Sequence, residues 1–377
     1  MSKPRILVIP GWYPSTLEPL NGDFIEHQVS IIRRAGYALD VVFYDGNIRY
    51  LSKGQISQCS RVSAYEQRSK DLVISGPTWP KNSVFGLHLW IKKFASHAIE
   101  FGATYGKPDI IHAHTYLGGA VAKRIAELWD KPYVITEHYT GWMTGNYRKS
   151  HHRLAKAAFT NADKITAVSK SLGDCLSREF AIQAEMVPNF IDESHFTLGT
   201  PHKEPIITCV GDLIKRKNWP LAIETVAQLR RQGVPCHLHM IGSGPEQPIL
   251  ERLCHRLGII ASVKFHGELS KVEVAKQLQK SSILLHTSHI ESYGIVIAEA
   301  LATGVPCVVV QNGGSAEFQD LKGFTEVTKP QPSIIAKIIQ RVTHQSPTPQ
   351  EIRDDYLKRF SSDKMVERIL NIYASMT

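Results

Sequence analysis

Two glutamates eight positions apart are the residues whose type and spacing point most directly to chemistry. Glu291 lies in a polar turn after the apolar run at 283–285, and the sequence predicts a helix that begins near Gly294 and carries Glu299 about two turns further on. The first N–H groups of a helix have no partner within it and attract anions. The pattern suits a ligand that offers phosphates to the amides and hydroxyl groups to the carboxylates, as a sugar nucleotide does.

A basic turn can supply the positive charge that a diphosphate needs. Lys215, Arg216 and Lys217 follow the apolar run at 206–210, so their side chains are expected just beyond the end of a strand. Cations placed there would stabilise the negative charge that accumulates on a departing diphosphate. The alternative interpretation is a solvated basic turn.

Three histidines are expected near the ends of two strands in the first half of the chain. His112 and His114 are two positions apart and therefore project from the same face of their strand, and His138 follows an apolar run. Open α/β sheets bind ligands at the carboxyl ends of strands, so His138 is a candidate for contact with a substrate hydroxyl and His114 for binding an acceptor. A satisfied structural histidine is the alternative. No third metal ligand lies nearby in the sequence, so a metal site is not expected.

Two further segments combine glycine with aromatic or basic residues. Gly22 opens a predicted helix, where it would let the backbone approach a phosphate or a sugar closely or would merely allow a tight turn. The segment 139–152 has glycine hinges around Trp142, Arg148 and Lys149. These three residues are candidates for binding an anionic or lipid-phosphate acceptor, and the alternative is a solvated start of a helix.

Alternating strands and helices are predicted to position these residues. In the first half, strands are expected at 6–9, 38–44, 109–114, 132–138 and 161–169, with a helix at 84–101 that would pack on the sheet or lie on a membrane, and a helix from Ser171 capped by its own hydroxyl. The stretch 45–81 shows no clear pattern. In the second half, strands at 206–210, 237–241, 263–266, 283–285 and 305–310 alternate with helices at 219–231, 246–257, 272–279 and from 294. This alternation predicts an α/β chain with parallel, doubly wound sheets.

Length and composition bound the class of protein. The chain has 377 residues, enough for two domains, and its 43% hydrophobic and 21% charged residues are typical of a soluble globular protein. No apolar run reaches the roughly 18–20 residues that span a bilayer, and the amino-terminal run is too short for a secretory signal, so we expect a cytoplasmic protein. The six cysteines are scattered without a CxxC pair, which disfavours a disulfide framework.

The net charge of +9 indicates an anionic partner: a phosphorylated substrate, an anionic membrane surface or nucleic acid. No zinc-finger, basic-zipper or RNA-recognition pattern is present, so nucleic acid is not expected. The sequence Gly242-Ser-Gly244 follows a predicted strand but lacks the third glycine of the dinucleotide-binding fingerprint. It is therefore interpreted as a tight turn and not as a site for NAD.

The paired glutamates resemble a motif of one enzyme family. Glu291 and Glu299, in Glu-Ser-Tyr-Gly-x-x-x-x-Glu-Ala, look like the paired-glutamate motif of family 4 retaining glycosyltransferases, and Lys217 matches the family's phosphate-binding lysine. The family's arginine, which usually follows the glycine before this lysine, is replaced by Asp212. Arg216 is the candidate substitute.

The resemblance covers nearly the whole chain, with its strongest motifs in the carboxyl-terminal half. His138 matches the family's active-site histidine, the segment around Gly22 resembles a loop over the donor phosphates, and 312–317 resembles the family's Gly-Gly-x-x-Glu segment. The resemblance implies the GT-B fold: two Rossmann-like, doubly wound domains that face each other across a cleft. Residues 1–195 would bind the acceptor and 196–349 the nucleotide sugar, with a linker near 193–204 and a closing helix at about 350–377 that crosses back to the first domain.

The resemblance also implies roles for individual residues. Glu291 would contact the donor sugar and Glu299 the ribose hydroxyls, while Lys217, Arg216 and the amides after Tyr293 would hold the diphosphate. The predicted donor-binding set is Gly22, Arg216, Lys217, Gly242, Glu291, Tyr293, Gly294, Ile295 and Glu299. The predicted catalytic residues are His138, Glu291 and Lys217.

The expected activity is the retaining transfer of a sugar from a nucleoside-diphosphate sugar to a glycan or lipid-linked acceptor, in the synthesis of a cell-surface polysaccharide or lipopolysaccharide. No cofactor or metal is expected, because side-chain cations and helix amides would stabilise the leaving group. Peripheral contact with an anionic membrane fits the basic charge. The alternatives are an epimerase or a phosphorylase on the same fold, and a non-catalytic protein that binds sugar nucleotides.

Overall fold

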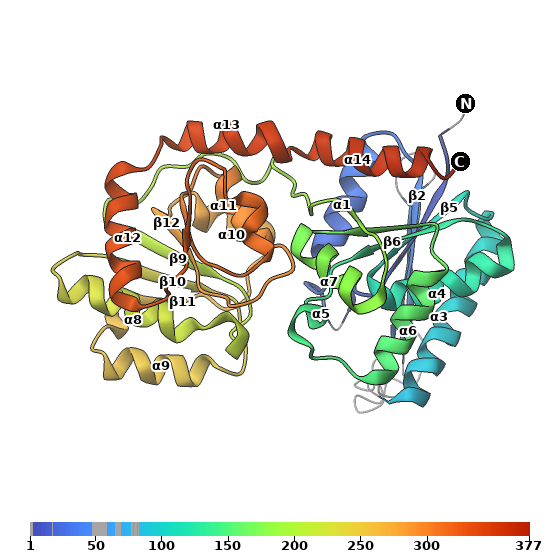
Figure 1. Cartoon of the computed structure of the whole chain (residues 1–377), viewed down its shortest axis with the longest axis horizontal. Coiled ribbons are helices and arrows are strands. Elements are labelled where there is room, and N and C mark those ends of the chain that lie inside the picture. The colour runs from blue at the N-terminus through green and yellow to red at the C-terminus, as the bar shows by residue number, and fades with distance from the viewer. Residues whose placement is uncertain are drawn as a thin grey trace. The chain divides into compact units, whose positions relative to one another are not determined.

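The computed structural model describes residues 3–16, 18–46, 59–64, 69–76, 78, 81 and 83–377, with the backbone alone for 59–64. The chain forms two compact units, Met1–Pro188 together with Met365–Thr377, and Asn189–Lys364. Each unit is built around one sheet (Figure 1).

The first unit holds an eight-stranded sheet with the strand order β3-β4-β2-β1-β5-β6-β7-β8. Neighbouring strands are parallel except for β3 and β4. The strands are β1 (Ile6–Pro10), β2 (Leu39–Gly46), β3 (Cys59–Ala64), β4 (Lys70–Gly76), β5 (Ile110–His114), β6 (Tyr133–Glu137), β7 (Lys164–Ala167) and β8 (Glu185–Met186). The five strands predicted in this half are confirmed, whereas β3 and β4 lie in the stretch that shows no clear pattern.

The helices of the first unit include a layer of three, in which α4 packs against both α3 and α6 (Figure 1). Its helices are α1 (Asp23–Arg34), α3 (Val84–Tyr105), α4 (Thr115–Trp129), α5 (Gly141–Thr144), α6 (Lys149–Thr160) and α7 (Lys170–Phe180). The predicted cap of α7 is wrong. Ser169, not Ser171, is the N-cap, because Ser169 has an extended backbone and its hydroxyl accepts from the Leu172 N–H at 3.2 Å.

The second unit holds a parallel six-stranded sheet with the order β11-β10-β9-β12-β13-β14. Its strands are β9 (Ile206–Val210), β10 (His237–Ile241), β11 (Val263–Phe265), β12 (Ile283–His286), β13 (Cys307–Val310) and β14 (Phe324–Val327). Its helices are α8 (Trp219–Arg231), α9 (Gln247–Arg256), α10 (Lys271–Leu278), α11 (Ile295–Ala302), α12 (Pro332–Gln345) and α13 (Pro349–Phe360), with short 3-10 turns η2 (Lys215–Lys217), η3 (Ile260–Ser262) and η4 (Gly314–Phe318). The predicted alternation is confirmed, and β14 and α12 extend it.

In both sheets the chain turns outward in two directions from the first strand. In the first sheet β1 lies between β2 and β5, and in the second sheet β9 lies between β10 and β12. Doubly wound sheets bind ligands beyond the carboxyl ends of their strands at the point where the strand order reverses. The topology therefore directs attention to the loops after β1 and β5 in one unit and after β9 and β12 in the other.

The carboxyl-terminal segment differs from the single closing helix implied by the resemblance. It forms α13, which belongs to the second unit, and α14 (Ser362–Ala374), in which the chain returns to the first unit at Met365. The second unit retains α13 because Arg353 donates hydrogen bonds to the carbonyls of Phe196 and Ala302, and because α13 packs on α11.

The boundary between the units also lies earlier than the predicted linker near 193–204. The second unit begins at Asn189, since its first residues are already bonded within it. The Glu193 carboxylate accepts from both the N–H and the hydroxyl of Ser362 at 2.9 Å. Within the described ranges, no helix is both long and apolar enough to cross a membrane. Five cysteines are buried free thiols: Cys175, Cys209, Cys236, Cys254 and Cys307.

We expect α4 to depend on the absence of a side chain at Gly118. A Cβ atom there would lie 2.2 Å from the carbonyl oxygen of Ile9 in β1, so the helix would have to move off the sheet. Gly118→Ala should therefore lower the free energy of unfolding by about 1–3 kcal/mol or more, the usual cost of overpacking, measured by urea denaturation.

Gly173 in α7 provides the matched control, because a Cβ atom there would lie 3.7 Å from Ala167, an ordinary contact. Gly173→Ala should raise stability by about 0.5–1 kcal/mol, since alanine favours a helix interior over glycine. A Gly118→Ala variant as stable as Gly173→Ala would contradict the argument.

Candidate functional site

In the second unit, Glu291 lies at the centre of a buried ion cluster. Lys217 Nζ lies 2.6 Å from Glu291 Oε1, Arg216 Nη1 donates to Glu291 Oε2 at 3.1 Å, and His286 Nε2 lies 3.4 Å from Oε1. Glu291 is only 7% exposed. The cations come from the turn after β9 and the histidine from the end of β12, so the cluster lies where the strand order reverses.

The charges in this cluster determine the protonation state of Glu291. Burial opposes ionisation of the carboxyl, but Lys217, His286 and Arg216 outweigh it and hold the pKa of Glu291 well below its usual value. Burial lowers the pKa of His286, and the neighbouring carboxylate only partly offsets that effect. Glu291 is therefore a carboxylate at neutral pH, held by two basic side chains.

Backbone contacts fix the two loops that meet in the cluster. Thr287 Oγ1 donates to the Lys217 carbonyl at 2.8 Å, and the His289 N–H donates to the Arg216 carbonyl at 3.3 Å. Behind the turn, Trp219 Nε1 donates to the Asp212 carbonyl at 2.8 Å. The basic turn is thus attached along its backbone to the loop that carries Glu291.

Glycines let neighbouring loops approach each other closely at this edge of the sheet. A Cβ atom at Gly314 would lie 2.5 Å from the Glu291 carbonyl oxygen, and the Glu291 N–H donates to the Asn312 carbonyl at 3.2 Å. Gly242, at the end of β10, has φ +132° and would place a Cβ atom 2.2 Å from the Gly211 carbonyl oxygen. The segment 312–314 therefore supports the turn at Glu291, and Gly242 lies against the loop after β9.

Helix α11 carries the remaining predicted donor residues. Gly294, with φ +91°, is its N-cap, and Ile295 is its first residue. Glu299 is buried in the same helix, and Lys271 Nζ lies 2.6 Å from its Oε1. The Tyr293 ring is buried against Phe318 at 5.1 Å between centroids, so this side chain belongs to the core beneath the turn.

Sequence reasoning missed His286 and Lys271. His286 is a polar residue at the end of an otherwise apolar strand run, which is a usable signal, but Lys271 is one of many lysines and gives none. His286 belongs to the cluster around Glu291, and Lys271 pairs with Glu299, so each contacts one of the paired glutamates.

In the first unit, His138 belongs to a column of buried imidazoles at the end of β5 and β6. The rings of His112 and His114 stack at 4.4 Å, and those of His114 and His138 at 5.2 Å. Phe24, in the first turn of α1, packs edge-on against His138 at 5.1 Å. The expected common face of His112 and His114 is confirmed.

The turn at Gly22 lies next to this column through Phe24. Gly22 has φ +75°, and a Cβ atom there would lie 2.6 Å from the backbone of Trp12. A tight turn therefore requires glycine at this position whatever it binds. Its predicted contact with donor phosphates stays a prediction.

A residue that the sequence reasoning did not single out, Glu137, organises the backbone around His138. Its buried carboxylate accepts from the N–H groups of His138 and Tyr139 at 2.8 Å and of Tyr116 at 2.9 Å. Burial raises the pKa of Glu137 to about 7, against the opposing effect of these hydrogen bonds. A charged residue within the apolar strand at 133–137 is the signal that could have found it.

The turn from β5 into α4 is strained at Thr115. This β-branched residue is fully buried and has φ +65°, a conformation that such residues rarely adopt. The turn places the next N–H, that of Tyr116, on the Glu137 carboxylate. Such strain persists only where the surroundings impose it, and it concentrates at functional sites.

The three other acceptor candidates differ in their surroundings. Trp142 is 2% exposed and packs among Tyr116, Tyr139 and Phe180 at centroid distances of 4.9, 5.4 and 5.0 Å. Arg148 and Lys149 are exposed at the start of α6. Trp142 thus fills an aromatic core that supports the segment, and the acceptor contacts of all three stay predictions.

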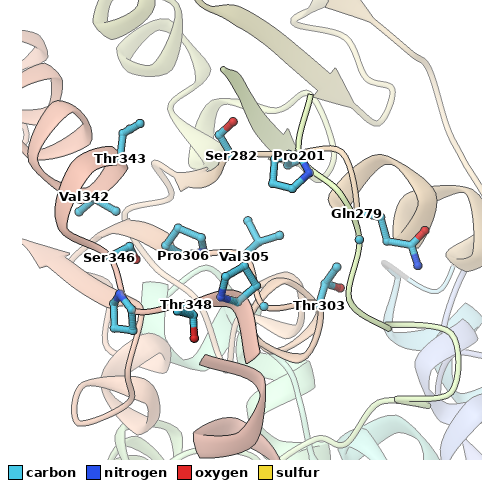
Figure 2. A pocket seen from close by; sticks show the side chains of 15 residues that line it. Pro201, Gln279, Ser282, Thr303, Val305, Pro306, Val342, Thr343, Ser346 and Thr348 are labelled. Atoms are coloured by element: carbon cyan, nitrogen blue, oxygen red, sulfur yellow. The ribbon is translucent and has the colours of Figure 1, made fainter. Parts of the chain in front are cut away.

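A cavity of about 330 Å³ in the second unit lies away from the Glu291 cluster (Figure 2). Ser281 and Ser282, ahead of β12, and Val305 and Pro306, ahead of β13, line one side. Val342, Thr343 and residues 346–349 line the other. The cavity is therefore at the amino ends of these strands, the edge opposite the cluster. It does not coincide with the predicted donor site.

Comparison with known proteins places the chain in a family. Residues 190–359 match the family described as Glycosyl transferases group 1, and residues 32–195 match that described as Glycosyltransferase Family 4. Glycogen synthase of Mycobacterium tuberculosis is 25% identical over 342 residues, covering 83% of this chain and 79% of that protein. The putative teichuronic acid biosynthesis glycosyltransferase TuaC of Bacillus subtilis is 25% identical over 399 residues, 99% of each chain.

Solved structures share the fold at low sequence identity. Sucrose-phosphate synthase of Thermosynechococcus elongatus has a TM-score of 0.79 at 18% identity over 99% of both chains. Anabaena HepE in complex with UDP-glucose has a TM-score of 0.75 at 18% identity, over 99% of this chain and 100% of that one. With two Rossmann-like sheets and both family matches in place, this chain is a glycosyltransferase that belongs to family 4 and has the GT-B fold.

Proposed function

We propose that this glycosyltransferase moves a sugar, with retention of configuration, from a nucleoside-diphosphate sugar to a glycan or lipid-linked acceptor in polysaccharide synthesis. The observation that carries the proposal is the cluster of Glu291, Lys217 and Arg216 where the strand order of the second sheet reverses. A carboxylate for sugar hydroxyls and two cations for phosphates lie within hydrogen-bonding distance of each other there.

Sugar transfer requires stabilisation of two opposite charges. The sugar passes through an oxocarbenium-like state while negative charge accumulates on the departing diphosphate. Lys217 and Arg216 now neutralise Glu291, and a diphosphate would compete with it for both cations. Binding of the donor would thereby redirect Glu291 to the sugar hydroxyls, because a buried carboxylate needs hydrogen-bond donors. Glu299, held by Lys271, would take the ribose hydroxyls.

The known ligands and names of similar proteins support the choice of substrates. Anabaena HepE has been solved with UDP-glucose, and the relatives include a glycogen synthase and a glycosyltransferase of teichuronic acid biosynthesis. These support a nucleotide sugar as donor and a polysaccharide as product, with a cell-surface glycan or lipopolysaccharide as one setting. His138 would contact the transferred sugar or the acceptor.

The products distinguish this proposal from its alternatives. Purified protein is incubated with UDP-, GDP- and ADP-sugars, with and without a chelator, after a thermal-shift panel has identified the bound nucleotide class. A transferase releases free nucleoside diphosphate in the presence of an acceptor. An epimerase returns an altered sugar nucleotide without an acceptor. A protein that only binds the sugar nucleotide shows a higher melting temperature with it but no turnover. Loss of turnover with the chelator would contradict metal-independent transfer.

Lys217→Ala should lower kcat/KM for the identified donor by about 100-fold or more, the usual effect of removing one group that stabilises a developing anion. Lys215→Ala is the matched control, because Lys215 is an exposed lysine of the same turn and should change kcat/KM less than about threefold. Steady-state kinetics of the wild type, Lys217→Ala and Lys215→Ala measure the two effects. Equal effects of the two substitutions would show that only the net charge of the turn matters.

Glu291 should also make stability depend on pH in a defined direction. Because the folded state lowers its pKa, the ion cluster stabilises the protein above the carboxyl's ordinary pKa near 4.5, and that stability is lost as the pH falls through the folded value. Glu291→Gln should therefore have a lower melting temperature than the wild type at pH 7, with a smaller gap in acid. Asp320→Asn, at an exposed carboxylate of the same unit, controls for the loss of one charge. A gap that widens in acid would contradict the cluster.

The proposal extends to peripheral contact with the cytoplasmic face of an anionic membrane. Val84 and Phe85, at the start of α3, are 70% and 63% exposed, and Lys92 is exposed two turns later on the same helix. Apolar side chains combined with lysines suit a membrane surface.

Sedimentation with vesicles of anionic lipid tests this contact. The wild type should sediment with the vesicles, whereas most of the Val84→Asp/Phe85→Asp variant should stay in the supernatant. Leu128→Asp, at an exposed apolar residue of another helix, should bind as the wild type does. Failure of the wild type to sediment would refute the contact.

A further inference from the structure

The histidine column of the first unit ends in the carboxyl-terminal helix. His112 Nδ1 lies 2.7 Å from the Tyr373 hydroxyl in α14, and His112 Nε2 lies 2.7 Å from Thr136 Oγ1. Thr136 Oγ1 in turn accepts from Thr166 Oγ1 at 2.7 Å. All of these side chains are buried. Because both ring nitrogens of His112 have partners, its ring is held in one orientation.

The fixed ring of His112 packs against the ring of His114 and so limits its orientation. Its ring lies 4.4 Å from that of His114 with an angle of 26° between the planes. Burial lowers the pKa of His112 to about 3 and that of His114 well below its usual value. Both rings are therefore neutral, and a neutral imidazole has one nitrogen that donates and one that accepts.

The contact between His114 and His138 links the tautomers of the two rings. His114 Nδ1 lies 3.0 Å from His138 Nε2. One of these nitrogens therefore carries a hydrogen and donates the hydrogen bond, and the other accepts it. If His114 donates, the proton of neutral His138 is on Nδ1; if His138 donates, its Nδ1 is an acceptor. The arrangement of His114 thus sets whether His138 Nδ1 donates or accepts.

We propose that His114 is a positioning residue for His138, and that Tyr373, through His112, holds His114 in place. This inference rests on the proposed function for the statement that His138 contacts substrate. His114 is 3% exposed and bonded to His138, so it acts through that residue and does not bind the acceptor directly. Helix α14, which returns the chain to the first unit, thereby becomes part of the support of the active-site histidine.

A double-mutant cycle on transfer tests the proposal. His114→Ala should lower kcat by about 10–100-fold, as the loss of residues that orient a catalytic group usually does, and Tyr373→Phe by less. Neither substitution should lower kcat further in a His138→Ala background, because a residue that acts through His138 has nothing left to position. Losses that simply multiply in the double variants would overturn the proposal.

Two variants separate positioning from mere packing. His114→Asn keeps a polar atom near the position of Nδ1 and should recover most of the lost activity, whereas a packing role would leave it as damaged as His114→Ala. Tyr356→Phe is the control for Tyr373→Phe, because the buried Tyr356 hydroxyl has no hydrogen-bond partner among the described residues. Tyr356→Phe should leave kcat unchanged in both backgrounds, and melting temperatures verify that each variant folds.

A spectroscopic readout tests the coupling without any assay of transfer. Nitrogen-15 spectra of histidine-labelled protein report the tautomer of each ring, and His138→Ala assigns the signals of His138. His114→Ala should shift the His138 ring nitrogens and change their tautomer balance, with a smaller change in His114→Asn. Unchanged His138 signals would overturn the inference. If His138→Ala retains full activity while these signals do shift, the assigned role of His138 fails and the positioning by His114 stands.

Discussion

The ion pair between Lys217 and Glu291 is the contact on which the site of the second unit depends. It joins the loop after β9 to the loop after β12, the two strands between which the strand order reverses. Burying a charge costs several kcal/mol unless a partner is well placed, so the loops must be held to within a fraction of an ångström. The hydrogen bonds from Thr287 to Lys217 and from His289 to Arg216 provide that precision. Gly314 serves the same precise placement of the loops, since a side chain there would displace the turn that carries Glu291.

A buried carboxylate also organises the first unit, but with different partners. Glu137 gathers the N–H groups of Tyr116, His138 and Tyr139, and so joins the turns after β5 and β6. The strained backbone at Thr115 and the raised pKa of Glu137 are costs of this arrangement. Neither would persist unless the surrounding structure fixed the two turns together. The column of imidazoles continues from His138, next to Glu137, through His112 to the Tyr373 hydroxyl in the last helix.

Local patterns in the sequence were sufficient to predict much of this structure. The strand at 206–210, the helix at 219–231 and the strand at 237–241 have the predicted bounds, because apolar runs there are bordered by glycine, proline and charged residues. The spacing of Glu291 and Glu299 likewise identified one edge of a sheet. The strands β3 and β4 escaped prediction because their sequence alternates too weakly for a periodicity argument. The contacts of Lys271 with Glu299 and of Tyr373 with His112 could not be predicted, because each joins residues far apart in the chain and no local pattern records such a pairing.

The partners of Glu291 and Glu137 differ, and this difference explains why Glu291 suits contact with a substrate and Glu137 suits support of the backbone. Glu291 is held by Lys217 and Arg216, whose flexible side chains could pair with the phosphates of the proposed donor without moving the backbone. Glu137 is held by backbone N–H groups, which can be withdrawn only by unfolding the turns that carry them. Glu291 can therefore lose its present partners through a change of side-chain rotamers alone. Glu137 can lose its partners only if the backbone turn that carries His138 changes. The carboxylate with side-chain partners thus lies where the donor phosphates are proposed to bind, and the one with backbone partners lies behind His138, whose orientation the proposed positioning concerns.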